Sequence, residues 1–173
     1  MDPGLEDQLL ACERRLGIRL CIIDHHGSLH HRRGTLLSAR WQSHRSAPVC
    51  DIGFGPRCVQ HCRDQVNVRL ERKPAPFVTT CWKGLREIAV PVRWQGHHLA
   101  TLYAGTWRQA SLPAAGAGLP QAWTSHWRNL PLWNEAAVEG LREVLLLLCE
   151  GLTQRLIQAM PVGDLAAIHG QIL

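Results

Sequence analysis

Four of the seven cysteines are spaced so that their thiols could act together on one ligand. Cys58 and Cys62 are four residues apart in a segment predicted to be helical, so both thiols lie on one face, one turn apart. Cys50 precedes this segment, and Cys81 ends a predicted strand. Four thiolates hold zinc in tetrahedral sites and also ligate iron–sulfur clusters. The pattern therefore predicts a metal or cluster site, although a Cys-x3-Cys pair is a weaker signal than two Cys-x2-Cys motifs.

The same four thiols admit two further interpretations. They could be redox-sensing cysteines, since Arg57 and Arg63 flank the helical pair and cationic neighbours lower the pKa of a thiol. They could equally be ordinary buried cysteines, which pack as small hydrophobic side chains. Cys12, Cys21 and Cys149 stand in apolar patterns and are expected in the core. An odd number of cysteines argues against a disulfide framework.

Other motifs that often carry chemistry give little support for an enzyme. The histidine pairs at 25/26, 30/31 and 97/98 are sequence neighbours with diverging side chains, so we expect solvated polar residues. His61 is predicted to point away from the face that Cys58 and Cys62 share. The serine–histidine neighbours at 43/44 and 125/126 have the wrong geometry for a nucleophile and its base. Without a glycine-rich phosphate loop or patterned carboxylate pairs, the sequence predicts a protein that is not an enzyme.

The composition is that of a single globular domain. The chain has 173 residues, of which 46% are apolar and 19% charged. The longest uninterrupted apolar run, Val144–Cys149, is far shorter than the roughly 18 residues of a membrane span. Residues 1–6 show no basic segment leading into an apolar one, as a secretory signal has. We therefore expect a cytoplasmic protein without a membrane partner.

The net charge of +5 comes almost wholly from arginine, because Lys73 and Lys83 are the only lysines. Guanidinium groups suit the recognition of anions and phosphates. Direct binding of nucleic acid is therefore one interpretation. The charges are dispersed along the chain and are not interleaved with aromatic residues, so we expect no DNA contact from this segment itself.

The apolar periodicity predicts helices and strands in succession. Leu5–Leu16 is predicted as an amphipathic helix that stops at Gly17, and Ile18–Ile23 as a strand. The following polar stretch, up to Cys50, is expected to be irregular. Pro56 suits the first turn of a second helix, which runs to about residue 72.

The clearest β signal is a hairpin in the middle of the chain. Phe77–Cys81 is predicted as a strand, followed by a strand over Glu87–Trp94, a turn at residues 95–96 and a returning strand over Leu99–Trp107. Pro91 lacks a backbone donor, so its strand is expected at an edge or with that position facing outward.

A long helix is predicted from Asn134, a suitable N-cap, to about Met160. Its apolar residues recur every three or four positions, at Val138, Leu141, Leu145, Leu148, Leu152 and Leu156. This stripe fits either a coiled-coil seam between two copies or a helix that covers the core. The segment before the helix, Ser111–Pro120, is predicted as a low-complexity loop.

In the order and type of these motifs the chain resembles the PocR-type sensory domain of bacterial signalling proteins, which is often joined to an AraC-type DNA-binding domain. The resemblance covers roughly residues 5–108. The matching pieces are Leu5–Gly17, Ile18–Asp24, Cys50, Cys58/Cys62, Cys81–Leu85, Ala89–Val92 and Gln95-Gly96. Trp82 and Lys83 stand where the family more commonly has a histidine and a small residue.

The resemblance implies an α+β fold, a PAS-like variant with an antiparallel sheet and helices on one side, to which the long C-terminal helix is added. It also implies a sensor of small molecules, with simple hydrocarbon derivatives as ligands. We expect the pocket between the sheet and the Cys58/Cys62 helix, with Cys81, Trp82, Lys83 and Glu87 as ligand-binding residues. Strand alternation places Arg86 on the opposite face.

The sequence thus predicts the regulatory domain of a transcriptional regulator. Residues 1–133 would form the sensory domain, 134–160 a signalling and dimerisation helix, and 161–173 the start of a linker to an output domain. The expected partners are a small-molecule ligand, a second copy of the chain, and DNA only through an output domain outside this chain. The alternative is a redox-sensing protein whose zinc or iron–sulfur cluster is ligated by Cys50, Cys58, Cys62 and Cys81.

Overall fold

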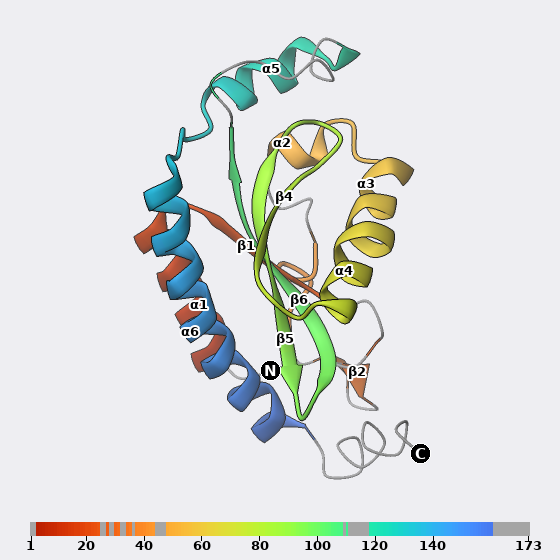
Figure 1. Ribbon diagram of the computed structural model, residues 1–173, viewed down its shortest axis with the longest axis vertical. Coiled ribbons are helices and arrows are strands. Elements are labelled where there is room, and N and C mark those ends of the chain that lie inside the picture. Colours follow the sequence, from red (N-terminus) through yellow and green to blue (C-terminus); the bar gives the residue numbers. More distant parts are fainter. Residues whose placement is uncertain are drawn as a thin grey trace.

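The computed structural model describes residues 3–24, 27, 30–31, 34–35, 37–43, 48–108, 110 and 118–160. Its centre is a four-stranded antiparallel sheet in the order β1-β6-β5-β4 (Figure 1). The strands of this sheet are β1 (Arg19–Ile23), β4 (Phe77–Thr80), β5 (Arg86–Trp94) and β6 (His97–Trp107). Two short strands, β2 (His30–His31) and β3 (Gly34–Thr35), pair with each other.

The predicted hairpin is present as β5 and β6. Trp94 pairs with His97, so Gln95 and Gly96 form a two-residue turn. Their φ angles are 46° and 87°. Positive φ at both central residues is what a type I′ turn requires, and the twist of this turn matches that of the strands.

Pro91 occupies a position that is locally at the edge of the sheet. It pairs with Thr101 of β6, while the ladder between β4 and β5 ends at Ala89. Over the described residues, the outer side of β5 at Pro91 therefore has no ladder partner. The expectation drawn from the missing proline donor is confirmed.

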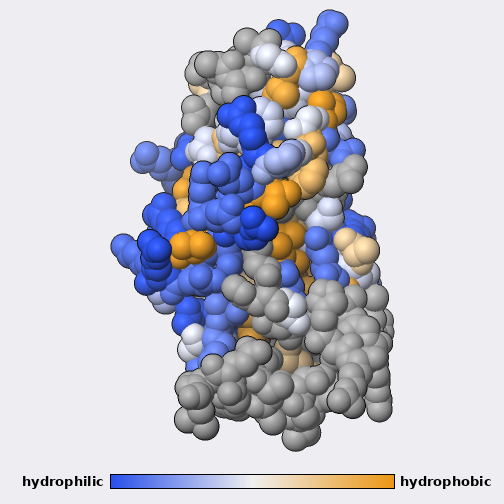
Figure 2. All heavy atoms as spheres, turned by 90° about the vertical axis from the view of Figure 1, so that its right-hand side faces the viewer, coloured by the Kyte–Doolittle hydropathy of each residue, from blue (hydrophilic) through white to orange (hydrophobic). Residues whose placement is uncertain are grey.

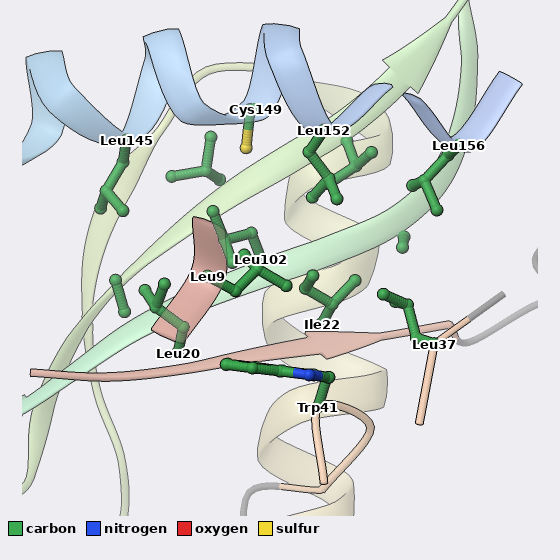
Figure 3. Packing of buried hydrophobic residues seen from close by; sticks show 14 of the residues in the cluster. Leu9, Leu20, Ile22, Leu37, Trp41, Leu102, Leu145, Cys149, Leu152 and Leu156 are labelled. Carbon is green, nitrogen blue, oxygen red and sulfur yellow. The ribbon is translucent and has the colours of Figure 1, made fainter. Parts of the chain in front are cut away.

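Helices α1 (Pro3–Leu16) and α6 (Glu135–Ala159) cover one face of the sheet (Figure 1). The apolar stripe of α6 packs in the core of the chain. Leu145 and Leu156 are fully buried, and Cys149 points the same way toward the sheet (Figure 3). These side chains pack with Leu20 and Ile22 of β1 in one cluster. The Asn134 side chain caps the helix by accepting a hydrogen bond from the Ala137 amide at 2.9 Å, as predicted.

The opposite face is covered by one continuous helical segment (Figure 1). It consists of α3 (Pro56–Gln60), a π-helical stretch (His61–Asn67) and α4 (Val68–Arg72), and it has the bounds expected from the sequence. Val66 and Leu70 pack there against Cys21, Ala89 and Tyr103 of the sheet.

Two helices were not expected. Helix α2 (Pro48–Asp51) lies in the stretch predicted to be irregular, and α5 (Gln121–Arg128) follows the low-complexity segment. Val49 of α2 packs with Trp123 and Trp127 of α5 and with Leu85 in a third apolar cluster. Both helices are too short for their periodicity to stand out in the sequence.

The α+β class, the antiparallel sheet and the long C-terminal helix are confirmed. Helices lie on both faces of the sheet, whereas the prediction placed helices on one side and added the long C-terminal helix. The segment from α3 to α4 covers one face, and α1 and α6 cover the other. His25 and His26, residues 111–117 and residues 161–173 lie outside the described residues. Within the described part of the chain, no helix combines the length and apolarity needed to cross a membrane.

Candidate functional site

All four cysteines singled out by their spacing line one small cavity between the sheet and the α3 side of the molecule. The cavity has a volume of about 40 Å³, and we call it the thiol cavity. Its walls are Cys50, Phe54, Cys58, His61, Cys62, Cys81, Lys83, Leu85, Glu87 and Thr106. Strand alternation explains the choice of face, because Glu87 and Ala89 face this side of the sheet while Ile88 and Val90 face the core under α6.

Lys83 is held inside the protein by a tight turn and by two backbone carbonyls. Gly84 has a φ of 79°, and the turn is closed by a 2.8 Å hydrogen bond from the Gly84 amide to the Cys81 carbonyl. Lys83 is 1% exposed, and its Nζ donates to the carbonyl oxygens of Cys50 at 2.7 Å and Ile52 at 2.6 Å. These bonds tie the end of α2 to the turn that carries Cys81.

Glu87 supplies the carboxyl group of the thiol cavity. Its side chain is 7% exposed, and burial raises the pKa of the carboxyl from 4.5 to about 7. A carboxyl with this pKa can both donate and accept a hydrogen bond near neutral pH. Arg86 does not share the site: its Cζ lies 5.9 Å from the ring centre of Trp107.

Trp82 lies beside the thiol cavity rather than in its wall. Its indole Nε1 donates a hydrogen bond to Cys58 Sγ at 3.1 Å. The guanidinium carbon of Arg57 lies 4.4 Å from the centre of the Trp82 ring, a cation–π contact. Trp82 therefore orients one of the thiols and is itself covered by an arginine.

His61 lines the thiol cavity, contrary to the expectation that it points away from Cys58 and Cys62. Its Nε2 lies 3.1 Å from Thr79 Oγ1, and its Nδ1 lies 3.0 Å from Gln65 Oε1. The prediction assumed α-helical spacing, whereas the helix becomes π-helical at His61 and turns the side chains by a different angle. π-Helical stretches are frequent at functional sites, but sequence spacing does not show them.

The π-helical stretch is tied to the sheet by further hydrogen bonds. Tyr103 donates through its hydroxyl to the Cys62 carbonyl at 3.3 Å, and Thr101 donates to Asn67 Oδ1 at 3.2 Å. Together with the contact between His61 and Thr79, these bonds fix the helix wall of the thiol cavity against β4 and β6.

Burial disfavours the charged form of three of the four thiols, those of Cys50, Cys62 and Cys81. Burial raises the pKa of Cys50 and Cys62, and it raises the pKa of Cys81 to about 11, with the Glu87 carboxylate acting in the same direction. The suggestion that Arg57 and Arg63 favour thiolates is wrong for Cys62, because burial raises the pKa of this thiol, while Arg63 pairs with Asp64 at 2.7 Å.

In the described residues, no three histidine, cysteine or acidic side chains are placed to hold a metal ion. The zinc or iron–sulfur site at Cys50, Cys58, Cys62 and Cys81 therefore stays a prediction. Of the other sequence-based candidates, Cys21 and Cys149 are buried in the core as expected, and Cys12 is half-buried against it.

A wider hollow of about 210 Å³ lies outside the thiol cavity and shares Phe54, Cys58 and Cys62 with it. Phe54 and Val59 are 40% and 42% exposed in this region. Figure 2 views the molecule from the side of α3 and α4, where apolar residues interrupt a largely hydrophilic surface. Phe54 and the two thiols thus border both the outer hollow and the thiol cavity.

The sequence profile of one protein family, described as the sensory domain found in PocR, matches residues 5–147. The match extends beyond the hairpin through α5 and into α6. No curated protein and no solved structure matches the chain.

Proposed function

Because the chain belongs to the family of sensory domains found in PocR, we propose that it binds a small molecule in the thiol cavity and acts as a regulatory module rather than an enzyme. One observation carries this proposal: a buried lysine and a buried carboxyl, Lys83 and Glu87, line a small cavity otherwise walled largely by thiols and apolar groups. Convergent polar groups in an apolar pocket are the usual signature of a ligand site.

The ligand class follows from the size and the walls of the cavity. A volume of about 40 Å³ holds only a few water-sized groups, so the ligand has few heavy atoms. Leu85 and Phe54 favour an apolar part, while Glu87 offers a carboxyl that can donate or accept a hydrogen bond. A short alcohol or diol satisfies these requirements.

Access runs through the outer hollow in this proposal. Cys58 and Cys62 stand between the two spaces, and Trp82 holds the Cys58 sulfur by its indole N–H. A modest movement of the Trp82 ring would release Cys58 and open the route. Trp82 would then contribute to ligand binding by controlling entry, without forming the wall.

The signal would travel through the sheet to the long helix. Glu87 lies in the thiol cavity, while its neighbours Ile88 and Val90 pack in the core beneath α6. A ligand that displaced β5 would change the packing of α6, provided that it binds one arrangement better than the other. In this proposal α6 passes the change to a DNA-binding output domain of a transcriptional regulator and contributes to pairing with a second copy.

The test is binding of two- to four-carbon alcohols and diols, followed by the NMR signal of the Trp82 indole N–H and by thermal melting. Trp82→Phe identifies that signal among the seven tryptophans. We expect at least one compound to shift it and to raise Tm.

Two cysteine variants serve as a matched pair. Cys62→Met fills the cavity with a larger flexible side chain and should abolish the response, whereas Cys12→Met, outside the cavity, should retain it. A concentration of 50 mM is about 50 times a Kd of 1 mM and would nearly saturate a site of that affinity. A response that is absent at 50 mM of every probe, or one that survives Cys62→Met, would refute the proposal.

A cysteine-ligated metal is the second candidate, favoured by the meeting of all four predicted cysteines in one cavity. Binding would require the thiols to lose their protons and to move closer together. Elemental analysis and an absorbance spectrum of protein purified without oxygen test it. Near-stoichiometric zinc or iron that is lost in Cys58→Ser and Cys62→Ser would support a metal, and a colourless, metal-free, folded protein would exclude it.

A further inference from the structure

A second and much larger cavity lies at the end of the sheet where β1 begins and β6 ends. Its volume is about 520 Å³, within the range of roughly 300–1,000 Å³ that is usual for small-molecule sites. Three arginines, Arg14, Arg19 and Arg40, line it, and we call it the arginine cavity. It is distinct from the thiol cavity, with which it shares Thr106 among the described residues.

The charges around the arginine cavity favour an anion. Besides the three arginines, the described lining contains one acidic residue, Glu13, which leaves a surplus of two positive charges with histidine neutral. The guanidinium group presents several N–H donors in a planar fork that matches carboxylate and phosphate oxygens.

Glu13 fixes two of the arginines in place. Its side chain is 7% exposed, and Oε1 accepts a hydrogen bond from the Leu20 amide at 2.9 Å. Its Oε2 lies 2.6 Å from Arg40 Nη2 and 3.5 Å from Arg19 Nη1. The carboxylate is thus anchored to the backbone of β1 and orients both guanidinium groups at the cavity.

The two arginines nevertheless remain accessible. The side chains of Arg19 and Arg40 are 51% and 44% exposed. Each guanidinium carries five N–H donors, and the described contacts with Glu13 use one nitrogen of each group. Donors are therefore left for a ligand in the cavity. Arg14 also lines the cavity and takes no part in the described ion pairs of Glu13.

The rest of the wall is largely apolar. Its hydrocarbon surface comes from Ile18, just before β1, from Val49 of α2 and from Leu130, in the segment after α5. A bare inorganic ion would leave this surface uncovered. An anion with an apolar body would use both parts of the wall.

We propose that the arginine cavity binds a small organic oxyanion, a carboxylate or a phosphate monoester, whose charged group is held by Arg14, Arg19 and Arg40 and whose apolar part contacts Ile18 and Leu130. This site is a second binding site, and it does not depend on what occupies the thiol cavity.

Titration calorimetry at constant ionic strength tests the proposal, with benzoate, hexanoate and phenyl phosphate as probes and the uncharged amides benzamide and hexanamide as neutral counterparts. We expect at least one anion to bind and its neutral counterpart not to bind. The carboxylate and phosphate arms show which oxyanion is preferred. The Trp82 indole signal, which reports on the thiol cavity, distinguishes this result from the outcome for the proposed function.

Arg14→Gln should weaken binding by about tenfold, the loss of one charge-assisted hydrogen bond. Arg15→Gln is the matched control, because Arg15 is the next residue of α1, is exposed and is not part of the described cavity wall. Binding of no anion, equal binding of the neutral counterparts, or equal losses in the two variants would each overturn the proposal. Because Arg14 is exposed, neither variant is expected to disturb folding.

Discussion

Gly105 of β6 lies directly opposite Glu87 of β5, and a Cβ atom on Gly105 would come within 2.8 Å of the Glu87 Cβ. It would also lie 3.0 Å from the Arg86 carbonyl oxygen. Gly105 lines the arginine cavity and Glu87 lines the thiol cavity, so the two cavities meet at this pair of strands. The close approach leaves room for glycine alone.

Gly105→Ala should lower the free energy of unfolding by about 1–3 kcal/mol, since the strands must separate to admit the methyl group. Gly140→Ala is the control, because a Cβ there meets nothing within 4 Å and the residue lies inside helix α6. It should raise stability by about 0.5–1 kcal/mol through the better helix propensity of alanine. Urea unfolding measures both, and equal effects of the two substitutions would contradict the crowding at Gly105.

Lys83→Met should destabilise the protein, because the carbonyls of Cys50 and Ile52 lose their donor. The expected cost is roughly 1–3 kcal/mol for each carbonyl that stays buried without a hydrogen bond. Lys73→Met changes the other lysine of the chain, which is exposed, and should shift stability by less than about 0.5 kcal/mol. If thermal and urea unfolding gave the same stability for both variants, Lys83 would not be the anchor described above.

Glu87 should make stability depend on pH in a defined window. Between about pH 4.5 and 7 the folded protein keeps a proton on Glu87 that the unfolded chain releases. The free energy of unfolding should therefore fall as the pH rises through this window, by about 3 kcal/mol if the whole shift is expressed.

Glu87→Gln removes this titration, so the variant should gain stability over the wild type as the pH rises from 5 to 8. Urea unfolding at both pH values measures the difference. Glu150→Gln, at an exposed position of α6, should leave the wild-type pH dependence in place. A Glu87→Gln variant that retained the full slope would show that another group titrates.

Leu145→Ala and Leu147→Ala should differ sharply although they lie on the same helix. Leu145 is fully buried against the sheet, and truncating it should cost about 2–5 kcal/mol. Leu147 is 71% exposed, and truncating it should change stability by less than about 0.5 kcal/mol. Comparable losses in chemical unfolding of the two variants would mean that the outward face of α6 is also covered in solution.

Local sequence patterns were sufficient for most of the regular elements. The hairpin around Gln95-Gly96, the helix opened by Pro56 and the helix capped by Asn134 lie where alternation, proline and capping chemistry predict them. These signals are local, because each depends on the conformational preference of a few neighbouring residues. Helices α2 and α5 were missed because one or two turns carry too little periodicity.

The sequence by itself determined that Cys50, Cys58, Cys62 and Cys81 are candidates for one site, since their positions at element ends and on one helical face are readable along the chain. Only the tertiary structure decided what surrounds them. The π-helical turn brings His61 into the wall, and burial raises the pKa of the Cys50, Cys62 and Cys81 thiols. The stripe of α6 likewise fits a seam or a core equally well, and packing against the sheet makes it core.

The arginine cavity could not be foreseen at all. Arg14 and Arg19 come from the end of α1 and the start of β1, and Arg40 from a segment far along the chain that is irregular in sequence. The buried Glu13 carboxylate brings two of these guanidinium groups together. Sequence fixes which charges are present, but the distances between them depend on how distant elements pack, and electrostatic interactions depend on those distances.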